Sequence, residues 1–378
     1  MPPILCVVEF PSNLLAVVST SKNVPNSSYM PQLDGLRALA VAAVAFSHWL
    51  PKNYHSGLPW GPGGVQLFFV LSGFLITGIL LRCREHENPW HSARAFYARR
   101  FLRIFPLFYA VLLVGFFLNI HPIRESILWH ISYFSNFYFV AIGGWNGPIS
   151  HFWSLAVEEQ FYLFWPAVIL LIPRHWLKPS LVGLIAIGLV SRFCLPILFP
   201  NASPLEALPN SNFDALGLGA LLAYTTGGII SRPIVPWLFV GGPAYFGFLG
   251  LRLLDFEIPF QSELEHTAML LFFAWVVSKA STGFHGVTGA ILQLPPLLYL
   301  GKVSYGLYIF HNFASLPVQL LAKTLDMPSI ELGPTRVAMM TIFTILAASL
   351  SWHMFEYPLN KLKRHFPYKK PGETAPQI

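Results

Sequence analysis

The sequence has very little charge for its length. Only 11% of its 378 residues are Asp, Glu, Lys or Arg, whereas 54% are hydrophobic, and soluble domains carry roughly a quarter charged residues. This charge is too sparse to cover a soluble core of this size, which excludes a soluble enzyme. The hydrophobic residues fall into repeated runs close to the ~20 residues that cross a bilayer, so the sequence predicts an all-α, polytopic membrane protein.

Cysteine is also scarce. Cys6, Cys83 and Cys194 are odd in number and widely scattered, which predicts neither a disulfide framework nor a metal site. The net charge of +7 would suggest nucleic acid for a soluble protein, but the Lys and Arg residues cluster in a few short loops, as membrane orientation requires. We therefore expect membrane lipids around the chain, no nucleic-acid partner and no metal cofactor.

The first thirty residues lack the basic start and the small-residue cleavage site of a signal peptide. The organised sequence begins at Leu33, so residues 1–30 are expected to be an N-terminal extension, with Met30 as a candidate native start. Residues 31–360 are predicted to form one transmembrane domain, followed by a basic cytoplasmic tail at 361–378. We find no internal repeat of the kind that marks an inverted-repeat transporter.

Hydropathy predicts about ten transmembrane helices, at 33–50, 65–82, 103–120, 157–173, 180–199, 213–230, 234–253, 264–280, 302–322 and 336–355. The aromatic segment 127–144 is ambiguous because polar residues are scattered through it. If it does not cross the membrane, the basic loops at 82–103 and 174–178 and the basic tail all fall on one side, which the positive-inside tendency makes cytoplasmic. We therefore expect 127–144 to be re-entrant or interfacial and both termini to be cytoplasmic.

Two ionisable residues lie in the first predicted span, LDGLRALAVAAVAFSHW. An ionisable side chain in a bilayer costs about 3 kcal/mol even on the lenient insertion scale, so each needs a partner, an aqueous cavity or a function. Arg37 and His48 lie within about 20° of the same helix face, about 16 Å apart along the axis. Alternatively, Arg37 snorkels to the interface and pairs with Asp34, while His48 caps the outer end.

A cluster of arginines precedes the third predicted span, in the stretch FYARRFLRIFP. Arg99 and Arg103 share a helix face, Arg100 lies beside them, and guanidinium groups bind phosphate oxygens in a bidentate manner. The cluster could therefore hold the phosphates of a nucleotide-bearing donor. A stop-transfer cluster that only fixes membrane orientation is the alternative.

Carboxylates are expected near the outer ends of two further spans. HFWSLAVEEQFYLFWP carries Glu158 and Glu159, and NFDALGLGALLAY carries Asp214. At a depth similar to that of His48, Glu158 or Asp214 could orient the imidazole of a general base. The alternative is that these carboxylates face water, which we favour for Glu159.

A polar stripe marks the ninth predicted span, GKVSYGLYIFHN, where one helix face carries Ser304, Tyr308 and His311. Such a stripe either lines a substrate cavity or bonds helices together. Glu356, at the inner end of the last span, is expected to pair with basic neighbours. In the second span, Gly73 and Gly78 are predicted to allow close helix packing.

Six motifs, taken in order, resemble those of the membrane acyltransferase 3 family. They are LDGLRALAVAAVAFSH, GGVQLFFVLSGFLITGIL, FYARRFLRIFPLFY, HFWSLAVEEQFYLFWP, FDALGLGALLA and GKVSYGLYIFH. The resemblance covers about residues 31–360. Each motif alone is weak because apolar helices look alike, whereas six in order are specific.

The resemblance implies O-acylation, usually O-acetylation, of bacterial surface sugars such as lipopolysaccharide, exopolysaccharide or peptidoglycan, with macrolides as acceptors in some members. It implies that Arg37 and His48 match the basic residue and the essential histidine of the family's first helix. It also implies that Arg100 and Arg103, with Arg99 alongside, match its arginine motif.

Two positions depart from the family's pattern. Gln66 stands where many members carry an acidic residue, and Asn212 stands where a basic residue is expected. If either side chain contacts the acceptor, the acceptor differs from the commonest kind.

These expectations combine into one mechanism. An acyl-CoA donor, most simply acetyl-CoA, is expected to bind the arginines at the cytoplasmic mouth. His48, assisted by Glu158 or Asp214, would deprotonate the acceptor hydroxyl or take the acyl group covalently, while the stripe of Ser304, Tyr308 and His311 binds substrate. The acceptor is expected to be a surface or lipid-linked carbohydrate and the location a bacterial inner membrane. A small-molecule acceptor, a flippase for a lipid-linked sugar and a non-catalytic scaffold are the alternatives.

Overall fold

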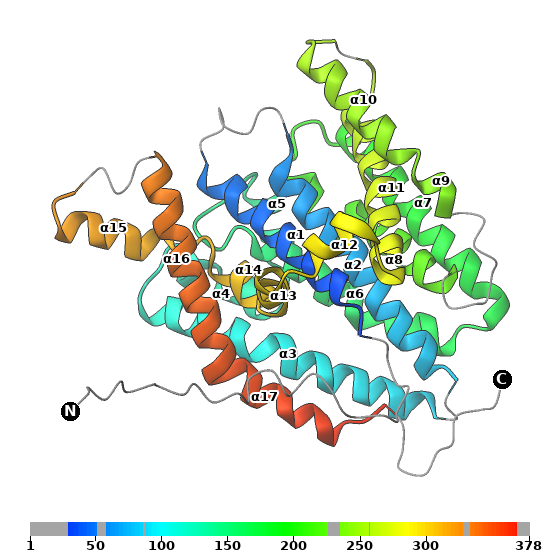
Figure 1. Cartoon of the computed structure of the whole chain (residues 1–378), viewed down its shortest axis with the longest axis horizontal. Coiled ribbons are helices and arrows are strands. Elements are labelled where there is room, and N and C mark those ends of the chain that lie inside the picture. Colours follow the sequence, from blue (N-terminus) through cyan, green and yellow to red (C-terminus); the bar gives the residue numbers. More distant parts are fainter. Residues whose placement is uncertain are drawn as a thin grey trace, which may run out of the picture.

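A computed structural model of the chain describes residues 29–50, 58–85, 88–225, 235–256, 258–327 and 333–368. Within these ranges the chain is helical and contains no β-strand, as Figure 1 shows. Most of the expected N-terminal extension and the end of the predicted basic tail lie outside the described residues. The predicted all-α class is confirmed.

Four helices build the centre of the molecule, and other helices lie on both sides of them (Figure 1). The central helices are α1 (Pro31–Trp49), α2 (Trp60–Cys83), α6 (Phe152–Leu171) and α8 (Phe213–Tyr224). On one side lie α7 (Arg174–Leu198), α9 (Val235–Leu238), α10 (Gly241–Leu253) and α11 (Gln261–Thr282), and on the other α15 (Ser315–Thr324) and α16 (Gly333–Ser351).

The remaining helices are shorter or lie along one face. In Figure 1, α3 (Pro89–Phe117) and α17 (Tyr357–Lys361) run along the lower face, and a π-helical turn at Trp352–Glu356 joins α16 to α17. Three of the short helices, α12 (Gly286–Leu292), α13 (Pro295–Lys302) and α14 (Ser304–Phe310), contact α1. The helix α4 (Ile123–Ile131) contacts α3, and α5 (Ser135–Ala141) contacts α6.

Proline and a side-chain cap mark where the first helices begin. Pro31 and Pro89 occupy the first turns of α1 and α3, where the missing N–H has no intrahelical partner to lose. The Asn88 side chain accepts a hydrogen bond from the backbone N–H of His91 at 3.1 Å, which satisfies one of the free donors at the start of α3. This early start brings the predicted arginine loop into a helix of 29 residues.

Glycines bring α2 and α8 into backbone contact. A Cβ on Gly73 would lie 2.0 Å from the carbonyl oxygen of Leu216, and one on Gly219 would lie 2.1 Å from that of Val70. Only residues without a Cβ permit this approach, so Gly73 packs helices as predicted. Gly78 has looser neighbours: a Cβ on it would lie 3.7 Å from the nearest atom.

Five helices are long and apolar enough to cross a membrane, or six if α11 and α12, bent by 85°, form one broken span. These helices support a multi-pass membrane protein. The expected number of about ten is not reached among the described residues, because several predicted spans are divided or shortened.

Two of the predicted spans are divided, and in both cases local sequence explains the break. The segment 302–322 forms α14 and α15, and α15 starts two residues before Pro317, so that this proline lies in a first turn, where its missing N–H costs no helix hydrogen bond. The segment 234–253 forms α9 and α10 on either side of a turn that ends at Gly241. The expectation of continuous helices there is wrong.

The ambiguous segment 127–144 falls within α4, α5 and their connections, and neither helix is long enough to cross a bilayer. It packs on the protein instead: the Tyr133 ring lies 4.5 Å from that of Phe108 on α3. His130 is fully buried, and burial lowers the pKa of its imidazole to about 4. The histidine is therefore neutral at ordinary pH and adds no buried charge.

The contact between α2 and α8 predicts a sharp effect of a single methyl group. Gly73→Ala is expected to lower the free energy of unfolding by about 1–3 kcal/mol, since the Leu216 carbonyl has to move. Gly183→Ala in α7 is the matched control, because a Cβ there meets nothing within 4 Å and the gain in helix propensity is the same. Thermal unfolding of the purified proteins in detergent measures both, and a Gly73→Ala melting temperature equal to that of the control would contradict the packing.

Candidate active site

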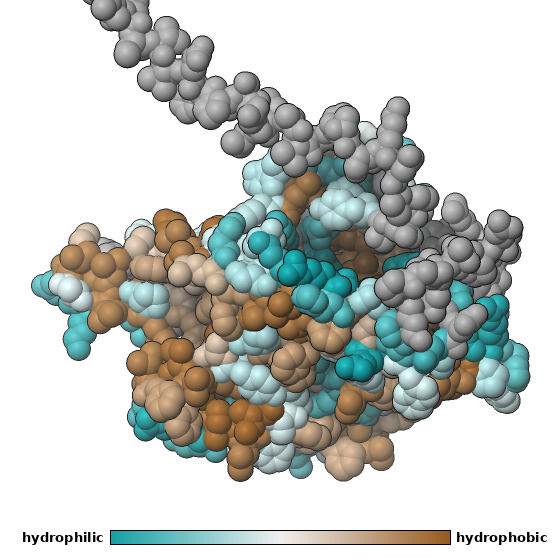
Figure 2. All heavy atoms as spheres, turned by 90° about the horizontal axis from the view of Figure 1, so that it is seen from below, coloured by the Kyte–Doolittle hydropathy of each residue, from teal (hydrophilic) through white to brown (hydrophobic). Residues whose placement is uncertain are grey.

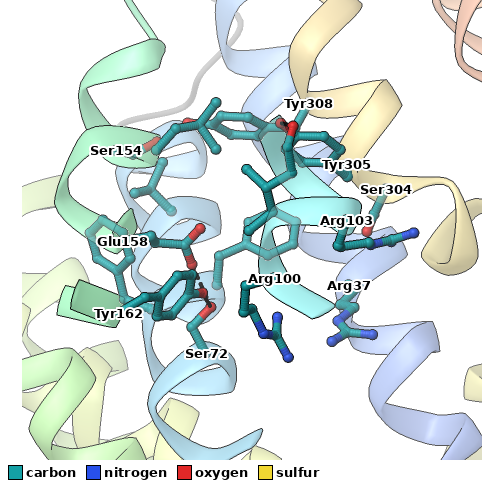
Figure 3. Close-up of a pocket in the computed structure, with 15 residues that line it drawn as sticks. Arg37, Ser72, Arg100, Arg103, Ser154, Glu158, Tyr162, Ser304, Tyr305 and Tyr308 are labelled. Atoms are coloured by element: carbon teal, nitrogen blue, oxygen red, sulfur yellow. Dashed lines mark hydrogen bonds between the residues drawn. The ribbon is translucent and has the colours of Figure 1, made fainter. Parts of the chain in front are cut away.

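Five helices enclose a pocket of about 110 Å³ near the centre of the molecule. Its polar lining comprises Arg37 of α1, Ser72 of α2, Arg100 and Arg103 of α3, Ser154, Glu158 and Tyr162 of α6, and Ser304, Tyr305 and Tyr308 of α14. Figure 3 shows the three arginines at one end and Ser154 with Tyr308 at the other, while Glu158 lies on the wall between them. The pocket therefore joins a cationic end to a hydroxyl-lined end.

Each arginine of the pocket has a different environment. Arg37 forms an ion pair with Asp34 at 2.8 Å, as the snorkelling interpretation predicted, yet it also lines the pocket. Arg103 lies 4.0 Å from Glu356, which confirms the expected basic partner of that carboxylate. The guanidinium of Arg100 lies over the Tyr162 ring at 5.7 Å.

Arg100 is the cation best placed for an anionic ligand. Among the described residues, no carboxylate lies within ion-pair distance of its guanidinium. Its side chain is directed into the pocket next to Arg37 (Figure 3). An anion entering at this end would meet a guanidinium with no carboxylate already bound to it.

Arg99 lies elsewhere, although the sequence grouped it with Arg100 and Arg103. Its guanidinium donates to the carbonyl oxygens of Lys363 at 2.9 Å and Phe366 at 3.3 Å and lies over the ring of Tyr368. Successive helix positions differ by 100°, so Arg99 points to the C-terminal segment while Arg100 points to the pocket. Figure 2, which views the molecule from below, shows hydrophilic atoms gathered over part of this lower face and hydrophobic atoms over the rest.

Glu158 lies deeper than the sequence suggested. Because α6 begins at Phe152, Glu158 is about 9 Å along the helix rather than at its outer end. Its carboxylate accepts a hydrogen bond from Ser72, whose hydroxyl also accepts from Tyr162 at 3.1 Å. Glu158 thus belongs to the pocket wall, and its expected role of orienting His48 stays a prediction.

A pair of hydroxyl groups closes the far end of the pocket. The Oγ of Ser154 and the phenolic oxygen of Tyr308 are 2.5 Å apart, and both hydroxyls also lie within hydrogen-bond distance of the His151 carbonyl oxygen. Ser304 and Tyr308 therefore line a cavity, as one of the two interpretations of the polar stripe required.

His48 pairs with a residue 263 positions away in the chain. Its Nδ1 lies 2.8 Å from Nε2 of His311, and the two rings are nearly coplanar, with 16° between their planes. His311 follows Tyr308 by one turn, so this pair lies just beyond the hydroxyl end of the pocket. A third histidine, His151, lies beside the pair, with its ring centre 4.5 Å from that of His311. Even so, no group of His, Cys, Asp or Glu in the described part of the chain could hold a metal ion.

The two histidines of this pair differ in exposure. His48 is exposed, whereas His311 is fully buried. Both ring nitrogens of His311 are engaged, Nε2 by His48 and Nδ1 by the Tyr308 carbonyl oxygen at 2.6 Å. With both nitrogens engaged, the contacts of His311 favour a role in holding His48 over the expected role in binding substrate.

Comparison with known proteins identifies the family. The family model described as an acyltransferase domain matches residues 30–353. The chain belongs to the acyltransferase 3 family.

Curated relatives in this family are about a third identical or less. The peptidoglycan O-acetyltransferase OatA of Listeria monocytogenes is 32% identical over 364 residues, covering 88% of this chain and 56% of the relative. The putative peptidoglycan O-acetyltransferase YrhL of Bacillus subtilis is 29% identical, covering 88% and 55%. The O-acetyltransferase OatA of Staphylococcus aureus is 28% identical, covering 88% and 57%.

These relatives are much longer than the matched region. The chain spans little more than half the length of the curated relatives it matches. No solved structure matches it. Because of this difference in length, the substrates of the longer relatives cannot be assigned to this chain from the similarity alone.

Asp214 forms a separate ionic cluster between α7, α8 and α11. Its carboxylate lies 3.3 Å from Nε of Arg192 and 3.4 Å from Nε2 of His266, and it accepts from the backbone N–H of Ala215 at 2.8 Å. Asp214 therefore does not orient His48. Local patterns do not predict this cluster, because its members come from three different helices.

The two departures from the family's pattern are partners of each other. Gln66 Nε2 donates to Oδ1 of Asn212 at 3.0 Å, and the Asn212 amide donates to the carbonyl oxygens of Glu206 and Leu208. Both side chains are buried, and neither lines the pocket. A neutral amide pair thus stands where the resemblance led us to expect opposite charges, and it lies on a different face of α2 from the pocket lining.

Several pocket residues escaped the sequence analysis. Ser72, Ser154, Tyr162 and Tyr305 lie inside the quoted motifs without having been singled out. The sequence feature that could have identified two of them is their spacing from Glu158. Ser154 is four residues before Glu158 and Tyr162 is four after it, so their hydroxyls lie on the same helix face as this carboxylate.

The amide pair predicts coupled stabilities. Gln66→Leu and Asn212→Leu are each expected to lower the free energy of unfolding by about 1–3 kcal/mol, since each leaves buried polar groups without a partner. The double variant is expected to cost about 0.5–1.5 kcal/mol less than the sum, as measured by denaturation in detergent. If the losses in free energy of unfolding were additive and the variants acetylated different acceptors, a purely structural role for the Gln66–Asn212 pair would be contradicted.

Proposed function

We propose that this chain is an integral-membrane O-acetyltransferase, which moves an acetyl group from acetyl-CoA to a hydroxyl group of a cell-surface carbohydrate. The observation that carries the proposal is the pocket, because it joins three arginines at one end to a hydroxyl pair at the other, one helical turn from His311, the partner of His48. Membership of an acyltransferase family supports the reaction class. The names of the relatives, which are O-acetyltransferases, support acetyl as the acyl group.

The arginine end is our proposed donor site. Guanidinium groups bind phosphate oxygens in a bidentate manner, and Arg100 has no carboxylate partner among the described residues. A cavity of about 110 Å³ is smaller than the roughly 300–1,000 Å³ of a whole-ligand pocket. It fits only the thioester end of a CoA donor, so the nucleotide would remain outside, against Arg37, Arg100 and Arg103.

Glu158 lines the passage between the two ends. The arm of CoA carries two amide N–H groups, and a carboxylate can accept several hydrogen bonds. We therefore place Glu158 beside this arm and assign it a binding role rather than the expected role of orienting His48.

The distribution of basic residues supports a cytoplasmic position for the donor site. Arg103 donates to the Lys302 carbonyl oxygen and Arg99 to that of Lys363, so basic segments from distant parts of the chain meet at the arginine end. Cytoplasmic loops are rich in Lys and Arg. The proposed location is a bacterial inner membrane, with the described end of the basic tail in the cytoplasm and His48 towards the outside.

His48 is the proposed catalytic residue. Its imidazole takes the proton of the acceptor hydroxyl as the hydroxyl oxygen attacks the thioester carbonyl; the carbon–sulfur bond then breaks, and the CoA thiolate receives a proton. In a two-step version, the imidazole first takes the acetyl group and then passes it to the acceptor. In both versions the exposed face of His48 is the side from which the acceptor arrives.

Peptidoglycan is the acceptor to test first, because the names of the Listeria and Bacillus relatives include it. The shared chemistry is a sugar hydroxyl presented at the outer membrane face. Lipid-linked sugars and small molecules with a comparable hydroxyl are the further acceptors to compare.

Donor binding can be tested without an acceptor. CoA is expected to raise the melting temperature of the wild-type protein, while Arg100→Gln and Arg103→Gln need about 10- to 100-fold more CoA for the same rise, since a charge-assisted hydrogen bond contributes about 1.5–3 kcal/mol. Arg94→Gln is the matched control, because Arg94 is exposed on the same helix and does not line the pocket. Equal CoA dependence in all four proteins would contradict the donor site.

Catalysis is tested on cell walls. Cells that express the wild-type protein are expected to yield glycans that release acetate under mild base, as O-acetyl esters do. His48→Gln is expected to abolish this release while CoA still stabilises the purified variant, because the donor site is at the other end of the pocket. His130→Gln, another imidazole replacement, serves as the control, and normal acetate release from a folded His48→Gln protein would exclude His48 as the catalytic residue.

A further inference from the structure

The hydrogen bonds of His311 define where its proton lies. The Tyr308 carbonyl oxygen, 2.6 Å from Nδ1 of His311, can only accept a hydrogen bond, so Nδ1 carries the proton. In a neutral imidazole the other nitrogen is then an acceptor. Nε2 of His311 therefore presents a lone pair to His48.

Burial keeps this imidazole neutral. His311 is fully buried, and among its described contacts no carboxylate is present to balance a positive charge. Burying an unpaired charge is far more costly than burying a hydrogen-bonded neutral ring. The ring of His151, 4.5 Å away, offers no negative charge either.

The tautomer of His48 follows from that of His311. Nδ1 of His48 lies 2.8 Å from Nε2 of His311. Because Nε2 of His311 presents a lone pair, Nδ1 of His48 must donate. A neutral His48 therefore carries its proton on Nδ1 and its lone pair on Nε2. The near coplanarity of the rings, at 16°, suits a hydrogen bond directed along that lone pair.

The backbone around His311 is fastened to the same helix as His48. The indole N–H of Trp49, the residue after His48, donates to the His311 carbonyl oxygen at 2.9 Å. The side chain of Asn312, the residue after His311, contacts Nδ1 of His151 at 3.1 Å. These contacts hold the backbone of His311 beside the end of α1 and next to His151.

We propose that His311 is a positioning residue that holds neutral His48 in its Nδ1–H tautomer, so that Nε2 is the nitrogen that receives the proton of the acceptor hydroxyl. The proposal rests on the proposed function of His48 and deepens it. A histidine used as a general base requires a partner on its other nitrogen to fix the tautomer. In this protein a buried neutral imidazole supplies that partner, where Glu158 or Asp214 had been expected.

The proposal separates the roles of hydrogen bonding and charge. Gln at position 311 retains a neutral acceptor oxygen at the end of a side chain of similar reach, whereas Leu retains volume without an acceptor. His311→Leu is expected to lower kcat by about 100-fold, the lower end of the contribution of a positioned base, with KM for acetyl-CoA unchanged. His311→Gln is expected to recover at least a tenth of the wild-type kcat.

The decisive measurement is the tautomer itself. Nitrogen NMR of the full-length protein labelled with ¹⁵N-histidine distinguishes protonated from unprotonated ring nitrogens, and His48→Gln and His311→Gln assign the two rings by loss of signals. The wild-type protein is expected to show His48 protonated on Nδ1 only. His311→Leu is expected to shift the His48 proton partly to Nε2, and His130→Leu, the matched buried histidine, to leave it unchanged.

Three outcomes would overturn the proposal: a wild-type His48 protonated on Nε2, an unchanged His48 tautomer in folded His311→Leu, or full kcat in that variant. Failure of the proposed function looks different. If His48→Gln retains transfer, His48 is not the base, whatever tautomer the spectrum reports.

Discussion

Ionisable groups in an apolar helix bundle need partners, and this requirement decides how the helices of the protein meet. Arg37 pairs within α1, Arg103 reaches Glu356 near the C-terminus, and Asp214 collects Arg192 and His266. His48 meets His311 across 263 residues. Because an unpartnered charge or polar group in hydrocarbon costs several kcal/mol, each contact restricts the arrangement of α1, α3, α8 and α14 around the pocket.

The central helix α2 separates two environments. Its residues Val65, Phe68, Phe69 and Ser72 follow helical spacing and line the pocket, whereas Gln66, Val70 and Gly73 lie towards α8. Glycine permits the close approach of α8, and the Gln66–Asn212 amide pair lies behind it. A change in that amide pair therefore acts on helix packing first, while a change at Ser72 acts on the proposed donor passage.

The direction of the proposed reaction follows α1. Arg37 lies at the cationic end of the pocket and His48 lies beyond the hydroxyl end, in the order that their spacing on one helix face predicted. The Ser154–Tyr308 contact lies between the cavity and the histidine pair. The hydroxyl pair therefore stands on the path between the proposed donor site and His48.

Local sequence was sufficient for the helical class, for the close packing at Gly73 and for the pocket residues that lie on one face of one helix, such as Arg37 in α1 or Ser304 and Tyr308 in α14. The period of an α-helix places side chains relative to their own axis, and hydropathy reports which segments avoid water. The tertiary structure alone decided which helix faces which. It turned Arg99 away from Arg100, gave Asp214 to Arg192 and His266, and brought His311 to His48, because contacts between distant segments depend on packing that no local period encodes.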